Sequence, residues 1–173
     1  RRPFHKSGPR VFLEKSPGAV WREHIRLHFG RRGRRITDEA LQQLLVAADL
    51  IPYDVQRLAH ELWDYAELAD RKEVDTEDLR LVVQRLASSQ AAYFERQWQQ
   101  LTLLQRRVLQ ALAIQGAADL TSQAVRQRFR LGPASSVQKA LQSLDAQDVL
   151  DRYEGRYFFV DPLMAAWIRQ AAG

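Results

Sequence analysis

The fold of this chain is constrained most strongly by its apolar residues, which recur at helical spacing. Each stretch with this spacing opens with a residue that can start or cap a helix. Four such stretches follow one another between residues 16 and 100 and predict a four-helix unit. The helix starts are Ser16-Pro17, Thr37, Pro52, and Asp75 or Thr76. The apolar faces are Trp21, Ile25, His28 and Phe29; Leu41, Leu44, Leu45 and Ala48; Val55, Leu58, Ala59, Leu62 and Ala66; and Leu79, Val82, Val83 and Leu86, with a continuation of the last helix through Phe94 and Trp98.

Three shorter helical segments follow residue 100. The first begins with the capping-box spacing of Thr102 and Gln105. Thr121 is expected to cap the second, Gly132 to end it, and Pro133 to start the third. The apolar face of the third segment consists of Val137, Ala140, Leu141 and Leu144.

Two β-rich runs come next, at residues 149–153 and 156–160, and they flank Glu154-Gly155 as in a tight hairpin. Asp161-Pro162 then begins a final helix. Three helices followed by a hairpin are the order of a winged helix-turn-helix domain. We predict a mainly α chain: a four-helix bundle over 16–100, a boundary near 99–102, and a winged helix with a small β-hairpin wing over 101–173.

The composition is that of a globular protein, with 46% hydrophobic and 27% charged residues. Cysteine is absent, which excludes disulfides and thiolate zinc sites and fits a reducing, cytoplasmic location. No apolar run approaches the roughly 18 residues that a membrane span needs, so no membrane partner is expected. The first 15 residues contain a possible short strand at Val11–Leu13 and no initiator Met, which suggests a piece of a larger protein.

The net charge of +5 is unevenly distributed. Residues 1–35 carry 11 Lys or Arg against two Glu, a net +9, whereas residues 36–100 carry −7 and residues 101–173 carry +3. A basic chain invites a nucleic-acid interpretation. The charge distribution weakens that interpretation for the winged helix, because most of the excess lies in the N-terminal block.

No nucleotide-hydrolysing loop is present, since such a loop ends in Gly-Lys followed by Ser or Thr. The four lysines of the chain follow His5, Glu14, Arg71 and Gln138, and none follows Gly.

His24 and His28 are four residues apart but lack a third ligand. We interpret His28 as a core or boundary residue and His24 as a surface residue. Ser135 and Ser136 do not lie in a Gly-x-Ser-x-Gly turn. We therefore predict no catalytic residue and no metal site.

The third helix of the winged unit would be its recognition helix, with a polar face turned outward. Glutamine can pair with adenine edges, and Lys or Arg with phosphate or guanine. Several acidic residues nearby weaken the electrostatic attraction to DNA. Contact with DNA and contact with protein therefore stay open. The candidate contact residues are Ser135, Gln138, Lys139 and Gln142, with Arg152 and Arg156 bracketing the wing.

The densest cationic run is Arg31-Arg32-Gly33-Arg34-Arg35, between two amphipathic helices. We interpret it as a solvated loop. The alternative is a contact with phosphate, of a nucleotide or a nucleic acid.

A longer pattern covers Leu50–Trp63, which reads Leu-Ile-Pro-Tyr-Asp-Val-Gln-Arg-Leu-Ala-His-Glu-Leu-Trp. It resembles the Gly-x-Pro-Tyr-x-x-Gln-x-Leu-Ala-x-x-Leu-Trp segment in the helical lid of AAA+/STAND-type ATPases of the archaeal-ATPase-like family. The flanking segments are similar to other parts of that family in the same order. They are residues 2–6 and 11–13 (the last core strand and its exit), 21–36 (the first lid helix) and 159–168 (the C-terminal winged helix).

The resemblance implies that the chain is the C-terminal part of a P-loop ATPase, a lid and a winged helix without the nucleotide-binding core. Residues 1–15 would be a residual strand and linker from that core. Pro52 would lie against the adenine ring, with Tyr53 and Arg57 as further nucleotide contacts. Two positions depart from the family: Leu50 replaces its Gly, and Arg57 lies one turn beyond the place of the sensor arginine of related lids.

The function implied is that of a regulatory module: the lid closes on bound nucleotide, and the winged helix relays that state to a partner. The chain would not be an enzyme by itself, and ATP or ADP would bind only in the full-length parent. Its partners would be the core of the same polypeptide and, through the winged helix, a protein or DNA. A DNA-binding winged-helix module and a protein-interaction scaffold are the two alternatives.

Overall fold

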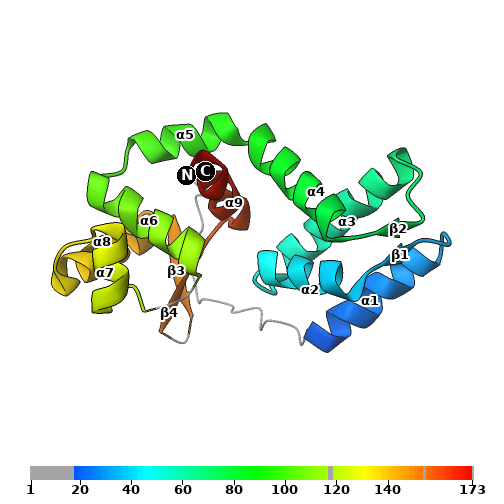
Figure 1. Ribbon diagram of the computed structural model, residues 1–173, viewed down its shortest axis with the longest axis horizontal. Helices are drawn as coiled ribbons and strands as arrows, with labels where there is room; N and C mark the ends of the chain where they lie inside the picture. The colour runs from blue at the N-terminus through cyan, green and yellow to red at the C-terminus, as the bar shows by residue number, and fades with distance from the viewer. Residues whose placement is uncertain (1–17, 117–118, 154, 173) are drawn as a thin grey trace, which may run out of the picture.

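The computed structural model describes residues 18–116, 119–153 and 155–172. Figure 1 shows two groups of helices, bridged at the top of the view by α4 (Thr76–Ser89) and α5 (Ala91–Gln99). The described residues are mainly helical, as the apolar spacing predicts. Ser16-Pro17 and the candidate strand at Val11–Leu13 lie outside them. None of the described helices combines the length and apolarity that crossing a bilayer requires.

The first group contains the predicted apolar faces as its core, with Phe29, Leu41, Leu44, Leu58 and Leu62 among the fully buried side chains. A short parallel pair of strands ties the two connections of this group together. The group consists of α1 (Gly18–Gly30), β1 (Arg35–Ile36), α2 (Asp38–Ala47), α3 (Pro52–Leu68), β2 (Glu73–Val74) and α4.

The prediction that His28 is a core or boundary residue is wrong, because its side chain is exposed. The buried stripe of α1 is the narrower set Trp21, Ile25 and Phe29, spaced by four residues. Residue 28 lies about 100° around the helix from residue 29, so its side chain points away from the interface in which Phe29 is buried.

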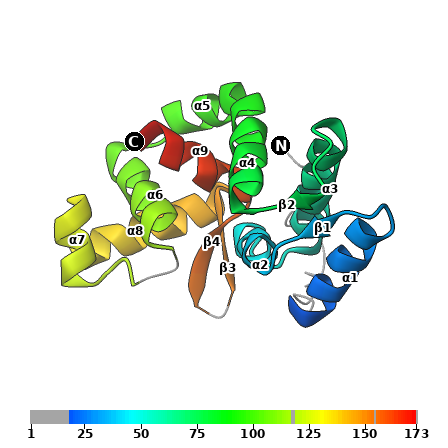
Figure 2. The ribbon, with the colours of Figure 1, turned by 45° about the vertical axis from the view of Figure 1, so that its right-hand side comes forward.

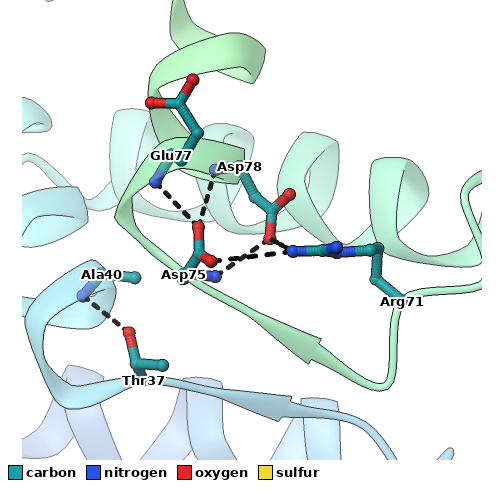
Figure 3. Close-up of polar contacts among 6 residues, drawn as sticks. All are labelled: Thr37, Ala40, Arg71, Asp75, Glu77 and Asp78. Carbon is teal, nitrogen blue, oxygen red and sulfur yellow. Dashed lines mark hydrogen bonds and ion pairs between the residues drawn. The ribbon is translucent and has the colours of Figure 1, made fainter.

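Local capping explains where α2 and α4 begin (Figure 3). The hydroxyl of Thr37 accepts a hydrogen bond from the Ala40 N–H at 3.2 Å. Asp75 accepts from the N–H groups of Glu77 and Asp78, at 2.8 and 3.1 Å, while Asp78 accepts from the N–H of Asp75 at 3.0 Å. This reciprocal pair is a capping box that uses Asp in both positions.

The cationic run is not uniformly solvated, which corrects the interpretation of Arg34. Arg34 is 7% exposed, and its Nε lies 2.8 Å from a carboxylate oxygen of Glu67 at the end of α3. A second guanidinium nitrogen donates to the backbone carbonyl of Arg71. The hydrogen bond from Arg34 lowers the pKa of Glu67. Arg34 therefore stabilises the connection between α3 and β2.

The predicted continuation of the fourth helix through Phe94 and Trp98 is also wrong. The chain turns at Gln90, whose N–H bonds to the carbonyl of Ala87, and a separate helix α5 begins. The turn aims Phe94 and Trp98 at Trp167 in the last helix, with ring centroids 6.0 and 5.7 Å away. Packing against that helix decides the break, and α5 faces the second group.

The second group has the predicted order of three helices, a hairpin and a final helix. Thr102 and Gln105 form the expected capping box. Thr121 is not the cap of the short helix, because its N–H and hydroxyl both donate to Asp119 and Ser122 takes the cap position. The elements are α6 (Leu103–Gln115), α7 (Gln123–Phe129), α8 (Ala134–Ala146), β3 (Leu150–Tyr153), β4 (Arg156–Phe159) and α9 (Pro162–Ala172).

The hairpin pairs β3 with β4 in antiparallel register, from Leu150 opposite Phe159 to Tyr153 opposite Arg156. Gly155 in its turn has φ +80°, a conformation that glycine adopts at little cost. In Figure 2 this hairpin extends away from α9 as a wing beside α8.

The last helix, α9, is buried on almost every side. Leu163, Met164, Ala165, Ala166 and Ile168 are each at most 9% exposed. A helix that is apolar all round must be covered from several directions. Here α9 packs against α6 of the second group and against α4 and α5, so both groups share one hydrophobic core.

Candidate functional site

The outward face of α8 holds the four contact residues expected there. Ser135, Gln138, Lys139 and Gln142 are exposed and lie at i, i+3, i+4 and i+7, which places them on one face of the helix. The opposite face is anchored by Val137, Ala140, Leu141 and Leu144, all buried. The face is polar with a single positive charge, a composition suited to hydrogen bonding rather than to strong electrostatic attraction.

The wing places two arginines on exposed positions, as expected. Arg152 in β3 lies opposite Tyr157 in β4, and its guanidinium carbon is 5.6 Å from the centroid of that ring. Stacking on the ring limits the conformations of the Arg152 side chain. Arg156 stands at the start of β4, next to the turn.

Sequence reasoning missed two further cations, Arg128 and Arg130, which are exposed at the end of α7. Arg126 and Arg107 are bound to backbone carbonyls: Arg126 to those of Thr121 and Gly132, at 2.9 and 3.0 Å, and Arg107 to that of Arg130, at 3.1 Å. Arginine at every second position from 126 to 130 was the available signal.

Acidic residues gather at the opposite end of α8. These residues lie three positions apart, from the end of α8 into β3, and are Asp145, Asp148 and Asp151. Asp151 accepts a hydrogen bond from the Arg152 N–H at 2.7 Å. Exposed positive charge near the polar face of α8 therefore lies at the end of α7, at Lys139 and on the wing. Contact with an anionic surface is favoured there and opposed near Asp148.

The candidate nucleotide contacts lie at the start of α3. Pro52 is its first residue, Tyr53 is 69% exposed, and Arg57 is half-buried one turn further along the same face. Leu50, which stands where the similar family has Gly, adopts φ +56°. The left-handed backbone that favours glycine is thus present, although the residue is Leu. Within the described residues, no group of three His, Asp or Glu is arranged to hold a metal ion.

Three helices, a two-stranded wing and a final helix give the second group the element order of a winged-helix domain. Residues 92–170 match the family model described as a probable winged helix domain. The match includes α5 from its second residue and ends within α9. No curated protein and no solved structure matches the chain.

Proposed function

We propose that this chain is the C-terminal regulatory module of an AAA+/STAND-type ATPase. Its first helical group acts as the lid over a nucleotide bound by a core domain, and its winged helix relays the nucleotide state to a partner. The module performs no catalysis. ATP or ADP binds only when the core of the same polypeptide is present.

The observation that carries this proposal is the shared burial of α9. A winged helix on a loose linker would not respond to movement of the first group. Here the last helix of the winged domain packs on α4 and α6 at once, and Trp167 contacts the rings of Phe94 and Trp98. Because packed interfaces shift as units rather than deform continuously, displacement of α4 is transmitted to α9.

The start of α3 supports the nucleotide part of the proposal. Tyr53 and Arg57 leave an exposed ring and a cation one turn apart, chemistry that suits a base and a phosphate. Their partner would be the nucleotide on the core.

The test uses the full-length parent protein. The sequence upstream of this chain must contain Gly-x-x-x-x-Gly-Lys followed by Ser or Thr. If that motif is absent, the proposal is wrong. If it is present, hydrogen exchange of α8 amides should differ between ATP-bound and ADP-bound protein. Trp167→Leu should weaken that difference without changing ATP affinity. Arg57→Ala should reduce ATP affinity about tenfold, the loss of one charge-assisted contact.

Binding of duplex DNA by the winged helix is the second candidate function. The observation in its favour is the set of exposed cations that adjoins the polar face of α8, namely Arg128, Arg130, Lys139, Arg152 and Arg156. Gel shifts at low salt test it, because each phosphate contact steepens the salt dependence of binding. Absence of any shift at low salt rejects DNA as the partner and leaves a protein partner.

A further inference from the structure

A groove of about 370 Å³ lies between α1 and α3, away from the winged helix. Its lining includes the apolar residues Trp21, Ile25 and Phe29 of α1 and Val55 of α3, all buried in the core. Pro52, Tyr53 and Arg57 are not among its lining residues. The groove is therefore distinct from the candidate nucleotide contacts.

The rim of the groove consists largely of Arg and His side chains. Exposed His24, His28, Arg31 and Arg32 come from α1 and the turn after it, and exposed His60 comes from α3. Among the described lining residues, none is Asp or Glu. A carboxylate oxygen of Asp64 lies 3.6 Å from the Nε2 atom of His60.

Two features bear on the chemistry of an occupant. The groove follows α1 from Trp21 to Phe29, about 12 Å at the helical rise, and continues to Arg31 and Arg32 in the turn after it. Apolar side chains at 21, 25 and 29 recur once per turn along this length. The indole N–H of Trp21 is buried and has no hydrogen-bond partner among the described residues, which is a costly state.

We propose that the groove binds an acidic amphipathic helix of a partner protein. About two turns of such a helix match the part of the groove that follows α1, and its apolar side chains recur about once per turn, as those of the floor do. Asp and Glu flanking these anchors meet the Arg and His side chains of the rim. This inference is independent of the proposed function, because it uses other residues and needs no nucleotide.

Single-stranded nucleic acid fits the groove less well. Base stacking needs open ring faces, but Trp21 and Phe29 are 8% and 2% exposed. The rings of His24 and His28 lie against each other at 4.4 Å, and the Arg32 guanidinium lies over Trp63 at 6.0 Å. The lining that remains open is mainly apolar, which suits aliphatic anchors.

The experiment is a display selection with a random 16-residue peptide library. It is run in parallel on the unaltered chain, on Arg31→Glu/Arg32→Glu, and on Arg85→Glu/Arg96→Glu. The last variant makes the same charge change on α4 and α5, outside the groove. The strongest peptide is then synthesised with a fluorescent label and titrated against each protein by anisotropy, with circular dichroism as the folding check.

We expect enriched peptides with apolar residues at helical spacing and an excess of Asp and Glu. Binding should fall at least tenfold in Arg31→Glu/Arg32→Glu and stay within twofold in Arg85→Glu/Arg96→Glu. Ala59→Trp, which fills the groove without changing charge, should also abolish binding. Three outcomes overturn the proposal: no enrichment, enriched peptides that are not acidic or that bind the groove variants unchanged, or a (dT)12 oligonucleotide that binds more tightly and loses affinity in those same variants.

Discussion

The indole rings of Trp98 and Trp167 meet edge to face, with centroids 5.7 Å apart and planes inclined at 76°. Trp98 lies in α5 and Trp167 in α9. Such edge-to-face pairs are favoured by the charge distribution of the rings. This contact closes the chain on itself, because α5 leads out of the first helical group and α9 is the last helix of the second.

Trp167→Ala should therefore destabilise the protein by about 3 kcal/mol, the lower end of the range for removing a large aromatic side chain, since Trp167 is only half-buried. Urea denaturation followed by circular dichroism measures the change. Tyr93→Ala is the control on α5, because Tyr93 is 48% exposed and should cost little. Equal effects of the two substitutions would contradict the conclusion that α9 holds the two helical groups together.

Arg130→Gly should stabilise the protein by about 1 kcal/mol, because Arg130 has φ +54° and a side chain disfavours this conformation. The hydrogen bond from Arg107 is kept, since it ends on the backbone carbonyl of Arg130. Thermal and urea unfolding measure the gain. Arg128→Gly should instead cost about 1 kcal/mol, because residue 128 is helical. A loss of stability in Arg130→Gly would contradict the argument.

Thr102→Ala should lower the free energy of unfolding by about 1 kcal/mol, the usual cost of losing an N-cap side chain. The hydroxyl of Thr102 accepts from the Gln105 N–H, and the Gln105 side chain accepts from the Thr102 N–H at 2.8 Å. Thr102→Ser keeps the acceptor and should be nearly neutral. If both variants lose the same stability, the cap is not the cause.

The Arg34–Glu67 contact should make stability depend on pH. The pKa of Glu67 in the folded protein lies below its ordinary value of 4.5, chiefly because of the hydrogen bond from Arg34. A lowered folded pKa gives stability that is fully present above 4.5 and is lost as the pH falls through the lowered value. The difference in melting temperature between the unaltered chain and Glu67→Gln should therefore be constant near neutrality and shrink on acidification below pH 4.5. Glu61→Gln, on the same helix, is the control, and an unchanging difference down to pH 2 would contradict the prediction.

Local patterns identified most helix starts and the wing correctly. Thr37, Asp75 and Thr102 cap helices through hydrogen bonds to residues two or three positions away, and the hairpin register follows from a two-residue turn. Such interactions depend on neighbours in the chain, so they can be predicted from the sequence. The outward face of α8, with Gln138 and Lys139, follows from the same periodicity.

The family resemblance and the structure meet at one residue in particular. Leu50 occupies the glycine position of the similar lid motif and still adopts the left-handed conformation, with φ +56°. Its side chain packs against the core. The difference from that motif can be read from the sequence, but the left-handed backbone at Leu50 is seen only in the structure.

The sequence by itself determined where most helices begin, which face of each is apolar, and that a hairpin follows the first three helices of the winged unit, since these depend on contacts within a turn or two. The tertiary structure alone decided that Arg34 is buried against Glu67, that His28 is exposed, that the chain turns at Gln90, and that α9 joins both helical groups. Each of these depends on which faces meet across long separations in the chain. An apolar stripe shows that one face of a helix must be buried, and the packed core shows which other element buries it.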